Sequence, residues 1–210
     1  MIIAIDGPSA SGKGTIARKL ASHFNLPYLD TGLLYRWVAL HLKNKNYAPD
    51  DAAAAANAAI FLRENIKEMG FDDPELRSHA ISQPSSVVAA MPEVRRELVE
   101  LQQQFATQPG GAVLDGRDIG TVIAPQAKIK LFITASAEKR AERRFKELQN
   151  KGQTATYEAV LKDLQARDAR DESRTTAPSK IAADAVLLDT SDLNVDEAFA
   201  AALSIVKENR

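Results

Sequence analysis

The sequence predicts an α/β fold in which a five-stranded parallel sheet is flanked by helices. Short apolar segments alternate along the chain with segments of helical periodicity. Most of the apolar segments are too short for helices and end in Asp or Gly. The 210 residues suffice for one such core with insertions. Because parallel strands need crossover connections, the alternation predicts a sheet whose strands are joined by helices.

The first predicted strand leads directly into a glycine-rich turn. Residues 2–5 form a continuous apolar run, which is typical of a strand covered on both faces. Gly7, Gly12 and Lys13 match the pattern G-x-x-x-x-G-K. Such a turn lets successive backbone N–H groups converge on an anion, while the lysine supplies a positive charge near the outer phosphates. These residues predict a phosphate-binding loop.

A helix is expected to follow the loop, because Ile16, Leu20 and Phe24 recur at helical spacing. The positive end of its dipole would then face the bound phosphate. The strict motif places Ser or Thr directly after the lysine to bind magnesium, whereas Gly14 intervenes here and Thr15 comes one position later. The residues alone therefore leave the metal contact open. An ordinary strand-to-helix turn is the alternative, and the combination of strand, spacing, lysine and helix weighs against it.

The other predicted elements follow from the same patterns. Asp50 or Asp51 is expected to cap a helix that begins in an alanine-rich stretch, and residues 70–86 are expected to form an irregular insertion on the surface. Ser136 is expected to cap a helix, and Asn194 opens a capping box. Four further strands are predicted, at residues 28–30, 112–114, 129–133 and 185–189. Further helices are predicted after Thr31, from Pro92, and from Tyr157.

Composition narrows the classes of function. The formal net charge is -1 and the pI is near 6.3, so we expect no general attraction to nucleic acid or to membranes. The chain has no cysteine, which excludes disulfides, thiolate nucleophiles and cysteine-based metal sites. The chain starts with a core strand, and no apolar run is long enough to span a bilayer. We therefore expect a soluble, cytoplasmic protein.

Carboxylates end several of the predicted strands. Asp6, Asp30 and Asp115 are expected at the carboxyl edge of the sheet, where ligands of open α/β folds bind. Asp115 has the position of a Walker-B carboxylate and could hold magnesium directly or through water. The alternative is an aspartate that merely caps a turn.

Arginines follow the strand ends. Arg36, with Thr31 and Tyr35, opens the second helix, and Arg117 follows Asp115, which suits a second phosphate. In isolation each arginine would be a solvated surface charge. Four more residues share one helical face, namely Arg167, Arg170, Asp171 and Arg174. A solvated face with i,i+4 ion pairs is an equal alternative for this cluster, and spacing does not decide between the two.

Four segments together closely resemble the bacterial cytidylate kinases in order and separation. They are G-P-S-A-S-G-K-G-T at 7–15, D-T-G-L-L-Y-R at 30–36, D-G-R-D-I-G-T-V at 115–122, and the arginine cluster at 167–174. The G-K-G-T segment is shared with many nucleoside monophosphate kinases, whereas the second and third segments are much more specific. The resemblance covers nearly the whole chain.

The resemblance implies a single P-loop kinase domain over residues 1–210, with a monophosphate-binding insertion at about 43–91 and a lid at about 145–160. It implies ATP-dependent phosphorylation of CMP and dCMP, with Mg²⁺ as cofactor, Thr15 and Asp115 as the metal residues, and a monomeric enzyme. ATP would bind the loop residues Gly7, Pro8, Ser9, Ala10, Ser11, Gly12, Lys13, Gly14 and Thr15. Lys13, Arg117 and Arg174 would be catalytic. The acceptor would contact Thr31, Tyr35, Arg36, Ser86, Arg95, Arg117, Asp118, Arg167, Asp171 and Arg174.

Within this set the resemblance implies a role for each group. Asp118 and Arg95, with Ser86 nearby, would read the cytosine, whose amine and ring acceptors suit a carboxylate and an arginine. Arg36 and Arg117 would bind the CMP phosphate. Asp171 and Arg167 would face the ribose, and Arg174 would close over the nucleotides.

Two other functions stay open on the residues alone. One is a P-loop kinase for another nucleoside monophosphate or for a small metabolite such as shikimate, against which the D-G-R-D segment and the paired arginine positions argue. The other is a nucleotide-dependent switch or binding module, against which the lack of an N-K-x-D signature and of an effector domain argues. Dependence on a phosphate acceptor distinguishes the kinases from the switch.

Overall fold

The computed structural model describes residues 1–210, which form two compact units. Unit 1 comprises Met1–Leu29 and Phe105–Arg210, and unit 2 comprises Asp30–Gln104. Unit 1 therefore contains the beginning and the end of the chain, and unit 2 is inserted between them. Each unit has its own apolar core.

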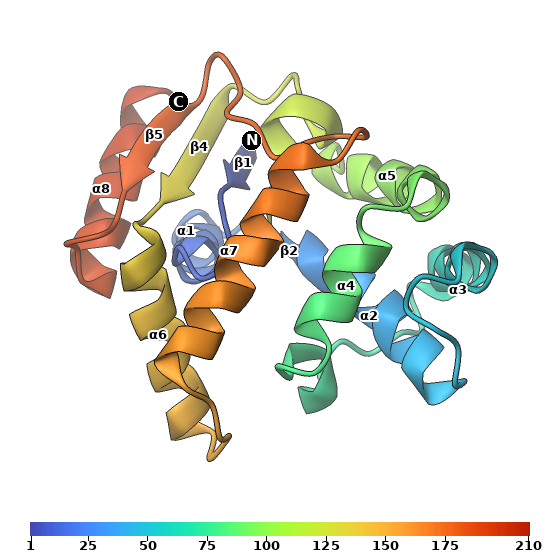
Figure 1. The fold of residues 1–210 in the computed structure, drawn as a ribbon. Coiled ribbons are helices and arrows are strands. Elements are labelled where there is room, and N and C mark those ends of the chain that lie inside the picture. Colours follow the sequence, from blue (N-terminus) through green and yellow to red (C-terminus); the bar gives the residue numbers. More distant parts are fainter. The chain divides into compact units, whose positions relative to one another are not determined.

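A five-stranded parallel sheet forms the centre of unit 1, which confirms the predicted fold class (Figure 1). The strand order is β2-β3-β1-β4-β5, so β1 lies in the middle and carries the glycine-rich loop at its carboxyl end. In the register, Ile3 pairs with Val113 of β3 and with Ile129 of β4. The strands are β1 Ile2–Asp6, β2 Tyr28–Asp30, β3 Ala112–Gly116, β4 Ile129–Thr134 and β5 Val186–Asp189.

Helices pack on this sheet through the apolar stripes that the sequence predicts. Ile16 and Leu20 are buried against Ile3, Ile5 and other strand residues. The expected caps are confirmed: Ser136 accepts from the Lys139 N–H, and Asn194 forms a capping box with Glu197. The helices of unit 1 are α1 Lys13–Phe24, α6 Ala137–Asn150, α7 Tyr157–Ser173 and α8 Val195–Glu208, and a π-helical turn, η2, spans Ile119–Ile123.

Unit 2 is helical. Its core joins Leu34 and Val38 to Leu62, Ile81 and Leu98, all of them fully buried. The predicted cap at Asp51 is confirmed, since its side chain accepts from the Ala54 N–H. The elements are α2 Thr31–Asn44, α3 Ala52–Asn65, the 3₁₀ turn η1 Pro74–Arg77, α4 Ser82–Val88 and α5 Pro92–Ala106, whose last residues belong to unit 1. None of the helices in the protein is long and apolar enough to cross a membrane.

The prediction that residues 70–86 form an irregular insertion on the surface is wrong for residues 82–86, which belong to helix α4. Helix α4 occupies part of this stretch and packs on α2, with Ile81 and Val88 buried. Pro84 suggested a break, but it is the third residue of α4, where a backbone N–H has no partner within the helix. The proline therefore fits the first turn of a short helix.

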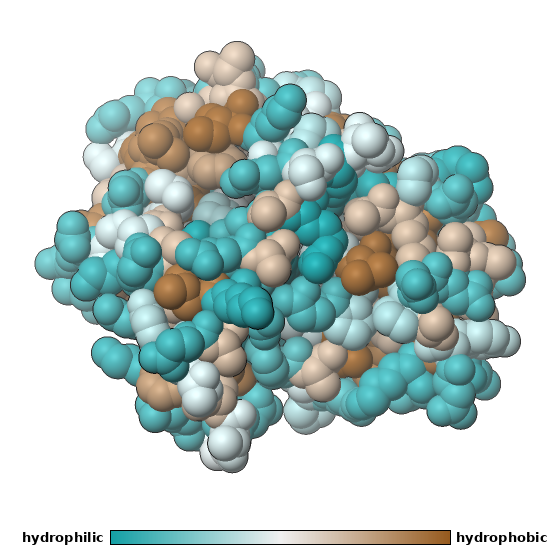
Figure 2. All heavy atoms as spheres, viewed as in Figure 1, coloured by the Kyte–Doolittle hydropathy of each residue, from teal (hydrophilic) through white to brown (hydrophobic).

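Strand β5 is an edge of the sheet and leaves apolar side chains at the surface. Val186 and Leu187 are exposed, and only Leu188 is buried in the core. Figure 2 shows apolar residues gathered on the part of the surface where β5 lies in Figure 1. The strand is short, it ends in Asp189, and Asp184 lies two residues before it; these features oppose edge-to-edge pairing with another sheet.

Candidate active site

The backbone of the glycine-rich loop requires glycine at both motif positions. Gly7 has a φ of 149°, and a Cβ there would lie 2.0 Å from the Ile133 carbonyl oxygen of β4. Gly12 has a φ of 90° and immediately precedes α1. Residues other than glycine rarely adopt either backbone conformation, and at Gly7 there is also no space for a side chain. The loop therefore starts in close contact with β4 at Gly7 and ends in a left-handed residue, Gly12, directly before the helix.

The carbonyl groups of the loop are held by donors from the surrounding structure. The Ser9 carbonyl accepts from Arg140 Nη1 at 3.2 Å, and the Ser11 carbonyl accepts from the Thr190 hydroxyl at 3.0 Å. By contrast, the backbone N–H groups of residues 9–12 donate no hydrogen bond within the protein. Unpaired N–H groups in succession at the start of a helix form an anion site. This arrangement suits a phosphate chain.

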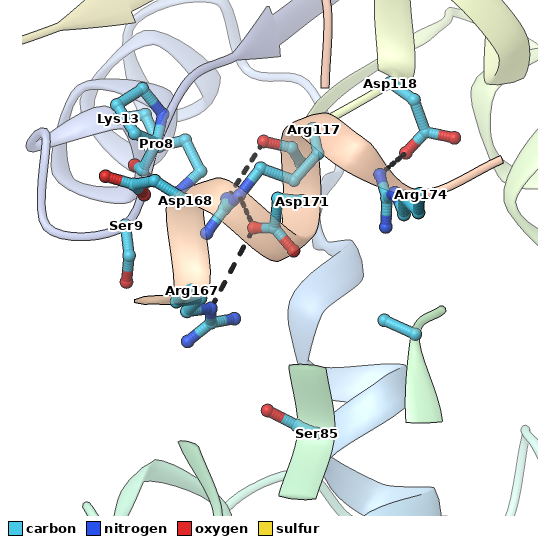
Figure 3. A network of polar contacts seen from close by, with 12 residues as sticks. Pro8, Ser9, Lys13, Ser85, Arg117, Asp118, Arg167, Asp168, Asp171 and Arg174 are labelled. Carbon is cyan, nitrogen blue, oxygen red and sulfur yellow. Dashed lines mark hydrogen bonds and ion pairs between the residues drawn. The ribbon is translucent and has the colours of Figure 1, made fainter. Parts of the chain in front are cut away.

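Lys13 is the first residue of α1, and its Nζ lies 3.4 Å from the Pro8 carbonyl oxygen. The side chain thus folds back over the loop that it follows, as Figure 3 shows. A positive charge at this point can approach the outer phosphates of a nucleotide held by the loop.

Asp115 lies in β3 and is buried next to the start of α1. Its Oδ1 accepts from the Tyr28 hydroxyl at 2.7 Å, and a Cβ added at Gly14 would lie 3.6 Å from its Oδ2. Thr15 follows in the first turn of α1. The aspartate is the fourth residue of β3, next to the last residue of the strand. No group of three or more His, Asp or Glu side chains is placed to hold a metal. One carboxylate and one hydroxyl fit Mg²⁺, which takes its remaining ligands from phosphates and water.

Asp171, a buried carboxylate in α7, lies next to an arginine of the same helix and an arginine of the loop that follows β3 (Figure 3). Asp171 Oδ2 accepts from Arg117 Nε at 2.9 Å, and Arg167 Nε lies 4.0 Å from the same oxygen. Nearby, Arg174 Nη2 lies 3.8 Å from Asp118 Oδ1. The side chains of Arg167, Asp171 and Arg174 are only 14, 7 and 5% exposed, so the solvated helical face is not what the structure contains.

The charge of this cluster is set by its arginines. Burial raises the pKa of Asp171, but the charges of Arg117, Arg167 and Arg174 outweigh burial and hold the pKa below its usual range. The aspartate is therefore ionised at neutral pH. Two carboxylates, Asp171 and Asp118, among three guanidinium groups leave an excess of positive charge, which suits a phosphorylated ligand.

The remaining predicted site residues lie in unit 2. Thr31 is the buried first residue of α2, and Tyr35 lies one turn later with the Arg95 guanidinium 5.7 Å from the centre of its ring. Arg95 is only 2% exposed, and Ser86 of α4 is equally buried. Arg36 donates to the backbone carbonyls of Leu76 and Ser78 at the end of η1. Arg95 and Tyr35 thus lie together in this unit.

Comparisons with known proteins show the family of this chain. A family model described as cytidylate kinase matches residues 3–208. The chain belongs to the cytidylate kinase family. A cytidylate kinase of Methylocella silvestris is 56% identical over 207 residues, which cover 99% of this chain and 94% of the relative. A cytidylate kinase of Azorhizobium caulinodans is 55% identical over 210 residues and is covered completely, as is this chain. The resemblance expected from the sequence is confirmed.

Among solved structures, an uncharacterized protein of Eubacterium ventriosum has a similar fold. The TM-score is 0.54 at 15% sequence identity, and the match covers 99% of this chain and 97% of the other. At this identity the likeness concerns the fold alone.

Sequence reasoning missed several polar residues that this member of the cytidylate kinase family uses to shape the site. Arg140 of α6 donates to the Ser9 carbonyl and forms a buried ion pair with Asp168 of α7 at 2.6 Å. It therefore joins the phosphate-binding loop to the helix that carries the arginine cluster. In unit 2, Gln102 donates to the Tyr35 hydroxyl at 3.4 Å. On a helix these side chains have the same sequence pattern as solvated polar residues, so spacing gives no signal for them.

Proposed function

We propose that the protein transfers the γ-phosphoryl group of ATP to CMP and to dCMP, yielding ADP with CDP or dCDP. An oxygen of the monophosphate forms a bond to the γ-phosphorus, and the bond from that phosphorus to the β,γ-bridging oxygen breaks. The observation that carries the proposal is the loop of unpaired backbone N–H groups at the start of α1, in the same unit as a buried cluster of arginines. Membership of the cytidylate kinase family supports the choice of acceptor.

At the donor side, the backbone of residues 7–15 binds the ATP phosphates. Lys13 neutralises charge on the transferred group, and the helix dipole of α1 acts in the same direction. Thr15 and Asp115 would hold Mg²⁺, and a bound Mg²⁺ would offset the negative charge that develops on the phosphates. The Tyr28 hydroxyl fixes the orientation of the Asp115 carboxylate for this task.

At the acceptor side, Arg36 and Arg117 bind the CMP phosphate, and Thr31 and Tyr35 support that contact. Cytosine offers an exocyclic amine beside ring acceptors, which match the carboxylate of Asp118, the guanidinium of Arg95 and the hydroxyl of Ser86. Asp171 and Arg167 face the ribose. Arg117 needs a fixed orientation to serve the phosphate, and the hydrogen bond to Asp171 supports one.

Phosphoryl transfer needs little covalent help from the protein. It requires two phosphates held in line, neutralised charge and the exclusion of water. Arg174 closes over the nucleotides and, with Lys13 and Arg117, stabilises the charge on the transferred group. The insertion at about 43–91 and the lid at about 145–160 close when nucleotides bind, which prevents hydrolysis of ATP. The enzyme acts as a monomer in the cytoplasm.

The test is an assay of ADP release with each nucleoside monophosphate in turn. CMP and dCMP should give the highest kcat/KM, and omission of the acceptor should reduce ADP release to background. Faster turnover with AMP, GMP or shikimate would assign the protein to another kinase class. ADP release that does not depend on an acceptor would instead indicate a nucleotide-hydrolysing switch.

A further inference from the structure

Asp6 is a buried carboxylate that the proposed reaction does not use. It is the last residue of β1, directly before the phosphate-binding loop, and only 4% of it is exposed. Its Oδ1 accepts from the Ile119 N–H and its Oδ2 accepts from the Gly120 N–H, both at 2.8 Å. Each oxygen thus binds one of two consecutive backbone groups, more than one hundred residues away along the chain.

The two amides belong to Ile119 and Gly120, which directly follow Arg117 and Asp118 in the sequence. The backbone here makes the π-helical turn η2, in which the Asp118 carbonyl accepts from the N–H groups of Val122 and Ile123. In such a turn the first N–H groups have no partner within the helix. Asp6 supplies that partner, so the carboxylate caps η2 and fixes the backbone that follows Arg117 and Asp118.

The far end of the same loop is held by a buried cation. Lys130 of β4 donates to the Pro125 carbonyl at 2.7 Å and to the Asp184 carboxylate at 2.8 and 2.9 Å. Its aliphatic stem packs on the loop, since a Cβ added at Gly120 would lie 3.1 Å from Lys130 Cδ and 3.4 Å from Asp6 Oδ2. Gly120 therefore lies between the two anchoring side chains, and the loop has little freedom at that point.

An ionised carboxylate is the form that accepts most strongly from both amides, because each of its oxygens carries part of the negative charge. Burial, the largest effect, and the nearby Asp118 raise the pKa of Asp6, the Gly120 and Ile119 N–H groups and the charge of Arg117 lower it, and the net result is a pKa raised to about 6. At pH 7 both oxygens therefore remain acceptors. A neutral amide in the same place would present an NH₂ group to one of the two N–H donors. The charge costs stability in the fold and supplies a contact that an uncharged isostere cannot make.

We propose that Asp6 is a positioning residue whose carboxylate fixes the loop that carries Arg117 and Asp118, in the orientation in which these two side chains bind the acceptor nucleotide. The inference rests on the acceptor roles proposed above for Arg117 and Asp118. It adds a residue of β1 to the acceptor side of the reaction, although that residue lies next to the loop that binds the donor. Asp6 thus directly precedes the loop proposed to bind the donor and holds the loop proposed to bind the acceptor.

The decisive variant is Asp6→Asn, which keeps the shape and removes one acceptor. The matched control is Asp51→Asn, where a carboxylate also accepts a backbone N–H at a helix start and an amide oxygen can replace it. Three quantities are measured in each protein: hydrogen exchange at the Ile119 and Gly120 amides, kcat/KM for CMP, and the dissociation constant of ATP. Amide exchange needs no substrate, so it reports on the loop independently of the reaction.

In Asp6→Asn, exchange at the two amides should accelerate, and kcat/KM for CMP should fall roughly tenfold to a hundredfold, because small misplacements of binding groups have effects of this size. The ATP dissociation constant should stay close to that of the wild type. The control should match the wild type in all three. Unchanged exchange, or faster exchange with unchanged CMP kinetics, would overturn the proposal. An equal loss of ATP affinity would overturn it too, because Asp6 would then act on the donor loop.

A second variant covers the case in which Asp6→Asn does not fold. Gly120→Ala leaves Asp6 intact and places a methyl group against both anchoring side chains. It should lower kcat/KM for CMP in the same direction, and a folded variant with wild-type CMP kinetics would contradict the proposal. If the wild-type protein does not phosphorylate CMP, the proposed function fails instead, and exchange at the two amides still decides whether Asp6 holds the loop.

Discussion

Replacing Asp171 with alanine tests the two tasks assigned to that carboxylate. Its Oδ2 accepts from Arg117 and lies 4.0 Å from Arg167 Nε, which leaves Oδ1 for a hydroxyl of the ribose. The variant removes the orientation of Arg117, which should slow both acceptors alike. It also removes the ribose contact, which should affect CMP more than dCMP because dCMP lacks the 2′-hydroxyl.

The expected decrease in kcat/KM follows from the burial of Asp171. A hydrogen bond to a buried charge contributes about 1.5 to 3 kcal/mol, which corresponds to roughly tenfold to a hundredfold in kcat/KM. The loss of Arg117 orientation should lower both efficiencies by a factor in this range. The ribose contact should lower the ratio of CMP to dCMP efficiency by a further factor of about ten or more.

Steady-state kinetics at saturating ATP, with CMP and dCMP as acceptors, measures both effects. The control is Glu172→Ala, which changes the next residue of α7, where the side chain is exposed. The ratio of efficiencies should fall in Asp171→Ala and stay constant in the control. A ratio equal to that of the wild type would refute the ribose assignment and leave Asp171 as the residue that orients Arg117.

Three further predictions concern single residues. Lys13→Ala should lower turnover by about a thousandfold or more while the melting temperature stays near that of the wild type, because the proposed role of Lys13 is to neutralise charge on the phosphates; a folded variant with near wild-type activity would contradict the proposed phosphate-binding loop. Asp118→Ala should lower kcat/KM for CMP far more than it weakens ATP binding, and equal effects on both would exclude a role in reading the base. Because the pKa of Asp6 is raised to about 6 from 3.8 in the unfolded chain, its contribution to stability is present in full below pH 4 and is lost as the pH rises through 6. Urea unfolding should therefore show the wild type gaining about 1 kcal/mol relative to Asp6→Asn between pH 7 and pH 5, and a difference that does not change with pH would contradict the raised pKa.

The sequence predicted most of the fold because local patterns determine most of it. Each strand is a short apolar run, and several helices begin at a capping side chain, such as Asp51 for α3 and Asn194 for α8. Helix α4 was missed because it has only seven residues, too few to show a period, and because Pro84 suggested a break. Its buried side chains are explained by packing on α2, which a local pattern cannot reveal.

The candidate site likewise contains features that the sequence predicts and features that it does not predict. The glycine-rich turn could be predicted because its backbone conformation depends on a contiguous motif with fixed glycine positions. The contacts of Asp6 and Arg140 could not be predicted from the sequence. Asp6 and Ile119 are 113 residues apart, and Arg140 has the pattern of a solvated helical charge. For the cluster around Asp171, spacing left two alternatives open, and burial decided against the solvated one. The contacts of Asp6 and Arg140 and the burial of the Asp171 cluster arise from tertiary contacts, which a single sequence does not display.

Phosphorus NMR of the complete reaction tests the central claim most directly. Wild-type protein is mixed with ATP, Mg²⁺ and CMP, and the products are followed without a coupling enzyme. We predict that CDP and ADP appear in equal amounts, that inorganic phosphate stays at background, and that Lys13→Ala forms neither product. Release of inorganic phosphate without formation of CDP, or an unchanged spectrum with the wild-type protein, would contradict the assignment of this chain as a kinase that phosphorylates CMP.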